Sequence, residues 1–93
     1  MFKIPSVNVI ESDDGFSVEV LGRTGLKYSE GKKTIRVDSE VLSGPSGMVI
    51  YTDSIVRWEP PCDGEMIDAA KRQIIVENIR NAFRFRGLEI QVS

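Results

Sequence analysis

Hydrophobic and polar residues alternate along much of the first half of the chain. Alternation at every second residue predicts β-strands that have one buried and one solvated face. In the first of these strands the alternation places Val7 and Val9 on one face and Ile10 on the other. Together with one apolar run, the pattern predicts strands at residues 7–11, 16–20, 26–29, 34–38, 48–51 and 88–92.

Short segments rich in glycine and acidic residues separate the first four predicted strands. Asp13-Asp14-Gly15 and Glu30-Gly31-Lys32 are typical of tight turns, because glycine adopts positive φ without steric cost. A third turn is predicted at residues 22–25, and residues 43–47 have the composition of a loop. Consecutive strands joined by short turns usually pair, so we expect an antiparallel meander.

Residues 68–86 carry the one long helical pattern of the chain. Asp68 is suited to cap the start of the helix, because its carboxylate accepts hydrogen bonds from free backbone N–H groups. Gly87 follows the predicted end near Arg86 and suits the left-handed conformation found just past many helices. The apolar side chains that share one face at the helical period are Ile75, Val76, Ile79, Ala82 and Phe83.

The predicted order of elements is β-β-β-β-β-α-β. The helix needs a surface for its apolar stripe, and the apolar face of the meander provides one. We therefore predict a single α+β domain over residues 1–93, built as a two-layer sandwich. It consists of a mostly antiparallel β-sheet, a meander of about five strands, one long C-terminal helix packed on one face and a final short strand.

Composition restricts the classes of protein to which the chain can belong. No apolar run approaches the length of a membrane span, and residues 1–5 lack a secretory signal, so we expect a cytoplasmic protein without membrane contact. The net charge is −2, but residues 1–68 hold 12 acidic and 7 basic side chains, whereas residues 69–93 hold 2 and 5. The charge is therefore unevenly distributed, with an acidic first part and a basic helix end. This asymmetry would affect the approach of a charged partner.

The sequence offers little catalytic machinery. It contains no histidine, which is the commonest general base and metal ligand. Cys62 is surrounded by acidic residues, which disfavour the thiolate that nucleophilic catalysis needs. The remaining candidate is a set of carboxylates for a metal-dependent or hydrolytic site, although their spacing does not match a Ca²⁺ loop. These carboxylates are Glu59, Asp63, Glu65 and Asp68.

Nucleic-acid binding is a further function that the sequence argues against. Arg80 and Arg84 form a basic stripe on the predicted helix, with Lys71 and Arg72 one or two turns earlier. The stripe lacks interleaved aromatic residues and the sequence pI is about 5.1, so we interpret these side chains as solvated. We expect a protein that is not an enzyme, needs no cofactor and binds no nucleic acid.

The stretch from Tyr51 to Pro61 connects the predicted sheet to the helix. Thr52-Asp53-Ser54 can cap a helical turn, which we place at residues 55–58. Trp58 has two alternative roles, because tryptophan is mostly buried in cores yet is also enriched at binding hot spots. The residues alone leave both alternatives open.

The chain resembles the immunity protein 74 family from about Phe16 to Val92. Its most diagnostic part is Tyr51 to Pro61, followed at a fixed distance by the helix. The motifs that carry the resemblance are, in order, Ser39-Glu40-Val41-Leu42, Gly44-Pro45, Met48-Val49-Ile50-Tyr51, Ser54-Ile55, Trp58-Glu59-Pro60-Pro61, Glu65-Met66-Ile67 and Ile74-Ile75-Val76-Glu77-Asn78-Ile79.

The resemblance implies a non-enzymatic inhibitor that binds a cognate bacterial toxin and blocks it. If that toxin has a basic groove, acidic residues around Trp58 would be complementary to it. Two alternatives remain open: the metal-dependent or hydrolytic module, and a structural module that forms a homodimer through a sheet edge. Our hypothesis for the residues that contact the toxin comprises Tyr51, Asp53, Ser54, Trp58, Glu59, Asp63 and Glu65.

Overall fold

Seven β-strands form one curled sheet in the part of the chain that the structure, a computed structural model, describes. The described residues are 2–22, 24–41, 47–60, 62 and 64–93, so most of the loop predicted at 43–47 lies outside them. A 3₁₀ turn η1 (Thr52–Ser54) and one helix, α1 (Ala69–Phe85), complete these residues. The strands are β1 (Phe2–Ser6), β2 (Val9–Ser12), β3 (Phe16–Val20), β4 (Gly25–Glu30), β5 (Lys33–Val41), β6 (Met48–Ile50) and β7 (Ile90–Val92).

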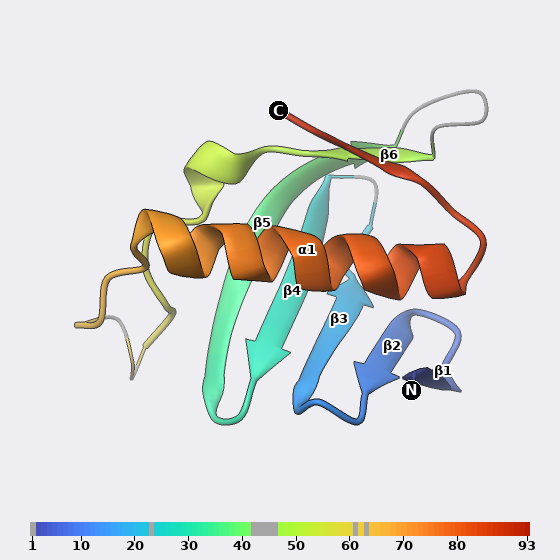
Figure 1. Cartoon of the computed structure of the whole chain (residues 1–93), viewed down its shortest axis with the longest axis horizontal. Coiled ribbons are helices and arrows are strands. Elements are labelled where there is room, and N and C mark those ends of the chain that lie inside the picture. Colours follow the sequence, from blue (N-terminus) through green and yellow to red (C-terminus); the bar gives the residue numbers. More distant parts are fainter. Residues whose placement is uncertain (1, 23, 42–46, 61, 63) are drawn as a thin grey trace.

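The strands lie in the sheet in the same order as in the chain (Figure 1). Every neighbouring pair from β1 to β6 is antiparallel, whereas β6 and β7 are parallel. A parallel pair requires a long crossover, which α1 supplies between these two strands. The predicted α+β architecture is therefore confirmed, with a meander that is one strand longer than expected.

The extra strand arises because the prediction of one strand at residues 7–11 is wrong. The chain turns at Val7 and Asn8, between β1 and β2. In β2 the buried residues are Ile10 and Ser12, while Val7 is 75% exposed. Ile10 lies opposite Val18 of β3, so the cross-strand register decides which face of β2 enters the core. Local alternation alone did not indicate which of the two faces would be buried.

Helix α1 begins and ends as predicted. The Asp68 carboxylate accepts a hydrogen bond from the Lys71 N–H at 2.7 Å. At the other end, Gly87 has a φ of 80° and its N–H donates to the Arg84 carbonyl. The Leu88 N–H donates to the Phe83 carbonyl, and these two bonds make a Schellman motif. This motif uses Leu88, so β7 starts at Ile90 and not at residue 88 as predicted.

The core lies between α1 and the face of the sheet that it covers (Figure 1). All five helix residues predicted to face inward are buried, and Ile75, Ile79 and Ala82 are fully so. The other face of the sheet carries polar side chains such as Glu19, Lys27 and Arg36, which lie opposite one another on adjacent strands. This division explains why alternation in β3, β4 and β5 was a reliable guide to burial.

Candidate functional site

Trp58 lies in the core, as one of the two alternatives predicted. Its side chain is 2% exposed, and its ring stacks on that of Tyr28. The surrounding segment, residues 55–67, is here called the Trp58 loop. The Glu59 N–H donates to the Thr34 carbonyl at 2.8 Å, which attaches the loop to the start of β5. The Trp58 side chain thus anchors the loop from inside while Glu59 points outward.

The second anchor of the Trp58 loop is the first part of α1, where the Arg72 Nε–H donates to the Ile55 carbonyl at 3.1 Å. Within the loop itself, the Ile67 N–H donates to the Val56 carbonyl at 2.8 Å. These bonds satisfy backbone groups of a loop that passes close to the core. The loop is consequently held by β5 on one side and by the helix on the other.

The turn η1 joins Tyr51 and Ser54 to β5. The prediction of a helical turn at residues 55–58 is wrong, because the turn is formed by Thr52–Ser54 and Ile55 is already buried. Ser54 Oγ donates to the Tyr51 carbonyl at 2.6 Å and accepts from the Asp38 N–H at 3.0 Å. This pair of bonds closes the turn and docks it on β5.

Tyr51 orients a carboxylate on the neighbouring strand. Its hydroxyl donates to Glu40 Oε2 at 2.9 Å, and its N–H donates to the Asp38 carbonyl. The hydrogen bond to Glu40, assisted by burial and by the charge of that carboxylate, raises the pKa of the Tyr51 phenol. Tyr51 therefore remains protonated and donates a hydrogen bond to Glu40.

Four exposed carboxylates lie on β5, on η1 and in the Trp58 loop, and we call them the acidic corner: Asp38, Glu40, Asp53 and Glu59. Asp38 and Glu40 project from β5, Asp53 lies on η1, and Glu59 accepts a hydrogen bond from Thr34 Oγ1 at 3.2 Å. Within the described residues, none of the four forms an ion pair. Among the described residues, these four carboxylates therefore carry negative charge that no direct ion pair neutralises.

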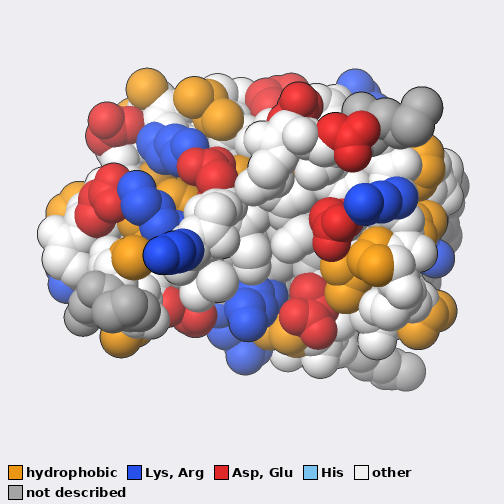
Figure 2. Space-filling view, turned by 90° about the horizontal axis from the view of Figure 1, so that it is seen from below, with side chains coloured by type: hydrophobic (Ala, Val, Ile, Leu, Met, Phe, Trp, Pro, Cys, Tyr) orange, Lys and Arg blue, Asp and Glu red, His pale blue; other side chains and the backbone are white. Residues whose placement is uncertain are grey.

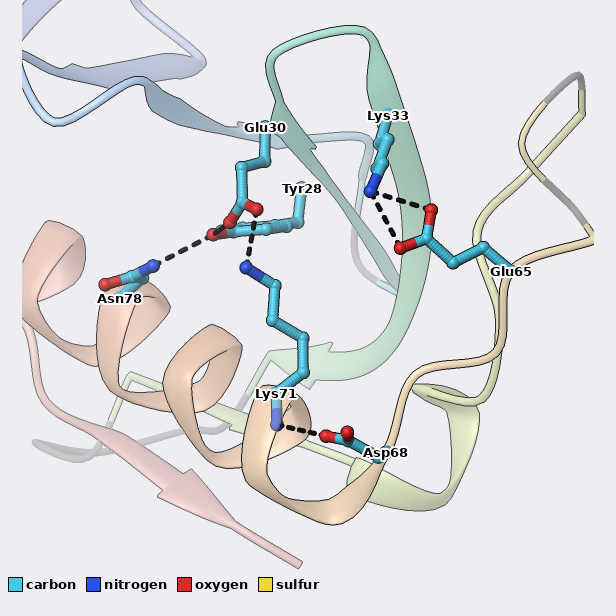
Figure 3. A network of polar contacts seen from close by, with 7 residues as sticks. All are labelled: Tyr28, Glu30, Lys33, Glu65, Asp68, Lys71 and Asn78. Carbon is cyan, nitrogen blue, oxygen red and sulfur yellow. Dashed lines mark hydrogen bonds and ion pairs between the residues drawn. The ribbon is translucent and has the colours of Figure 1, made fainter.

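Charge is better balanced at the end of the molecule where the β-hairpins turn. In Figure 2, which views the molecule from below Figure 1, acidic and basic side chains lie next to one another around a band of uncharged atoms. Glu65 belongs to this balanced region, because it pairs with Lys33 at 2.7 Å (Figure 3). The hydrogen bond to Glu65 raises the pKa of Lys33. Glu65 therefore differs from the carboxylates of the acidic corner, because it forms an ion pair.

The carboxylates proposed for a metal-dependent site serve separate purposes. Glu59 accepts from Thr34, Glu65 pairs with Lys33, and Asp68 caps α1. Asp63 lies outside the described residues. Among the residues with a described position, no three Cys, Asp or Glu side chains converge as metal ligands would. The arrangement gives that alternative no support.

A polar network beside Trp58 links β4 to α1 and has no counterpart in the sequence analysis (Figure 3). Tyr28 donates to Glu30 Oε1 at 2.8 Å and accepts from Asn78 Nδ2 at 2.9 Å. Lys71 donates to the other oxygen of Glu30 at 2.5 Å. Tyr28 and Asn78 are 50 residues apart in the chain, so no local pattern signals their contact.

Burial and hydrogen bonding shift the pKa values of this network in opposite directions. Burial raises the pKa of the Tyr28 phenol above 10.0, the hydrogen bond from Asn78 opposes this, and the interactions with Glu30 reinforce it. Burial alone would raise the pKa of Glu30. Hydrogen bonds from Lys71 and Tyr28, with the charges of Lys71 and Lys33, outweigh burial and lower it below 4.5. The network is therefore a neutral phenol beside an ionised, paired carboxylate.

Comparison with known proteins identifies the family. In the described residues no helix is long and apolar enough to cross a bilayer. No curated protein and no solved structure matches the chain at a significant level. The model of the family described as Immunity protein 74 matches residues 17–93, which span β3 to the end of the chain. The resemblance noted in the sequence is thereby confirmed, and the chain belongs to the immunity protein 74 family.

Proposed function

We propose that this protein neutralises a cognate toxin by binding to it and catalyses no reaction itself. Family membership over residues 17–93 carries this proposal, because immunity proteins of this kind are typically non-catalytic inhibitors of a toxin partner. The encounter would take place in the cytoplasm, where the one cysteine, Cys62, would remain reduced.

The acidic corner is the surface that we propose for the toxin. Tyr51 fixes Glu40 and Thr34 holds Glu59, so these carboxylates are ordered before a partner arrives. Groups that are already ordered lose less conformational entropy on binding. Negative charge that no direct ion pair neutralises also accelerates encounter with a basic surface. These features favour a toxin that presents lysine or arginine side chains to the corner.

Within this proposal the predicted contact residues have different tasks. Asp53 and Glu59 would meet the toxin directly, together with Asp38 and Glu40. Tyr51 and Ser54 would position the acidic groups, and Trp58 would support the loop from the core. A surface built this way binds by charge and shape, and it requires no reacting group.

The test is co-expression of the chain with the toxin encoded beside its gene. We expect the wild-type chain to restore growth and to co-purify with an inactivated form of the toxin. An unrelated toxin should be neither bound nor neutralised, which controls for general effects on growth. If the chain neither protects the cell nor binds the inactivated neighbour, the proposed function is wrong.

A further inference from the structure

An apolar groove lies at the end of the sheet that is next to the C-terminal end of α1. It has a volume of about 490 Å³ and lies between the β1–β2 turn, the start of β6 and the segment that follows α1. Its apolar lining includes Val7, Val20, Met48, Phe83, Leu88 and Ile90. Concave sites of this size with mainly apolar walls are typical binding sites for partner groups.

Large apolar side chains on the rim of this groove remain in water. Val7 is 75% exposed, Val41 is 49% exposed and Leu88 is 43% exposed, and all three line the groove. Exposed apolar surface costs free energy that burial against a partner would recover, at about 25 cal/mol per Å². Contiguous exposed apolar surface around a hollow is characteristic of an interaction site.

Specific hydrogen bonds hold the rim in place. Arg86 Nη1 donates to the Val7 carbonyl at 2.8 Å, and the Val20 N–H donates to the Asn8 carbonyl at 2.9 Å. On the opposite side the Schellman motif fixes the position of Leu88. The groove is therefore formed before any partner arrives.

The charged side chains that line the groove indicate which kind of partner segment could bind there. Arg86 and Glu89 are the charged side chains that contribute to the described lining. Glu89 Oε1 lies 3.6 Å from Arg84 Nε, so its charge is offset by a neighbouring cation. Arg86 hydrogen-bonds a neutral carbonyl and forms no ion pair with a described residue. The uncompensated charge at the groove is thus positive.

We propose that the groove binds a segment of the toxin in which apolar side chains stand next to a carboxylate. The apolar side chains would enter between Val7 and Leu88, and the carboxylate would pair with Arg86. This inference rests on the proposed function and adds a second contact surface to the acidic corner. The corner would govern the rate of association, whereas the buried apolar contact would govern the rate of dissociation.

Substitution of the exposed rim tests the groove without disturbing the core. The double variant Val7→Ser, Val41→Ser removes apolar surface from the groove. Met66→Ser, Ile74→Ser is the matched control, because these side chains are 60% and 51% exposed and do not line the groove. On immobilised inactivated toxin, we expect the groove variant to dissociate about tenfold faster with little change in association. The control should behave as wild type.

The outcomes separate this inference from the proposed function. If the wild-type chain binds the toxin and the groove variant dissociates at the same rate, the proposed role of the groove is wrong. The proposed function is then unaffected. If the wild-type chain does not bind the toxin, the proposed function is wrong. A peptide titration then tests whether the groove binds a segment of the proposed chemistry. A groove variant that converts a dimer to a monomer would show a second copy as the occupant, and would also overturn the inference.

The peptide titration uses nuclear magnetic resonance and needs no toxin. A short peptide of alternating leucine and glutamate should shift the signals of Val20, Phe83 and Ile90. The same peptide with lysine in place of glutamate should bind more weakly, and Arg86→Gln should abolish the difference. Absence of shifts at millimolar peptide, or equal shifts with both peptides, would contradict the proposed chemistry.

Discussion

The ring of Trp58 stacks on the ring of Tyr28, with centroids 6.3 Å apart and planes inclined by 27°. Lys33 Nζ lies 5.7 Å from the centroid of the Trp58 ring. The neighbouring residue, Glu59, points away from the core and belongs to the acidic corner. One side chain therefore attaches the Trp58 loop to β4, and the next one presents charge to a partner.

Replacement of Trp58 by alanine should strongly destabilise the domain. The buried ring fills space next to Tyr28, and its loss leaves a cavity that costs about 3–5 kcal/mol in the free energy of unfolding. Urea denaturation followed by circular dichroism measures this change. Val56→Ala, in the same loop but 40% exposed, should change the midpoint little. An unchanged midpoint for Trp58→Ala would show that the ring is not part of the core.

The pH dependence of stability should report the Glu30 network. The pKa of Glu30 is lowered in the folded protein, so its ionised form stabilises the fold above its ordinary pKa of 4.5. This contribution is lost as the pH falls below 4.5 through the folded pKa. Wild type should therefore exceed Glu30→Gln in stability at pH 7, and the difference should shrink on acidification.

Denaturant melts of both proteins at pH values from 7 down to 3 measure this difference. Asp53→Asn is the matched control, because Asp53 is exposed and forms no ion pair within the described residues. If the free energies of unfolding of wild type and Glu30→Gln differ by the same amount at every pH, the ionised carboxylate does not have the stabilising role.

Charge reversal in the acidic corner should slow association with the toxin. Asp53→Lys, Glu59→Lys replaces two exposed negative charges with positive ones, and we expect the association rate to fall about tenfold at low salt. The melting temperature should change little, because both side chains are exposed. Asp13→Lys, Asp14→Lys, in the β2–β3 turn, makes the same change in net charge and is the matched control. Equal slowing by both variants would mean that net charge, and not the corner, governs the encounter.

Gly87→Ala should weaken the end of α1. Gly87 has a φ of 80°, and an L-residue in this conformation costs about 1 kcal/mol relative to glycine. Gly64→Ala is a suitable control, because its φ is not in the left-handed region and no atom lies within 4 Å of the added Cβ. Thermal denaturation of the two variants measures the difference. Equal stability would show that Gly87 tolerates a side chain in this turn.

The sequence by itself determined the elements whose signals are local. Asp68 and Gly87 mark the two ends of α1, because capping depends on groups within one helical turn. The buried face of the helix and the strands from β3 to β5 followed from period alone, since each of these elements has one wet and one dry face.

Only the tertiary structure decided which surfaces those elements meet. It placed Trp58 against Tyr28, paired Glu30 with Lys71, and selected Ile10 over Val9 as the buried residue of β2. It also left Val7 and Leu88 exposed beside a groove. These outcomes depend on how separate elements of the fold meet. Their energies depend on distance in space and on register, which a local pattern does not encode.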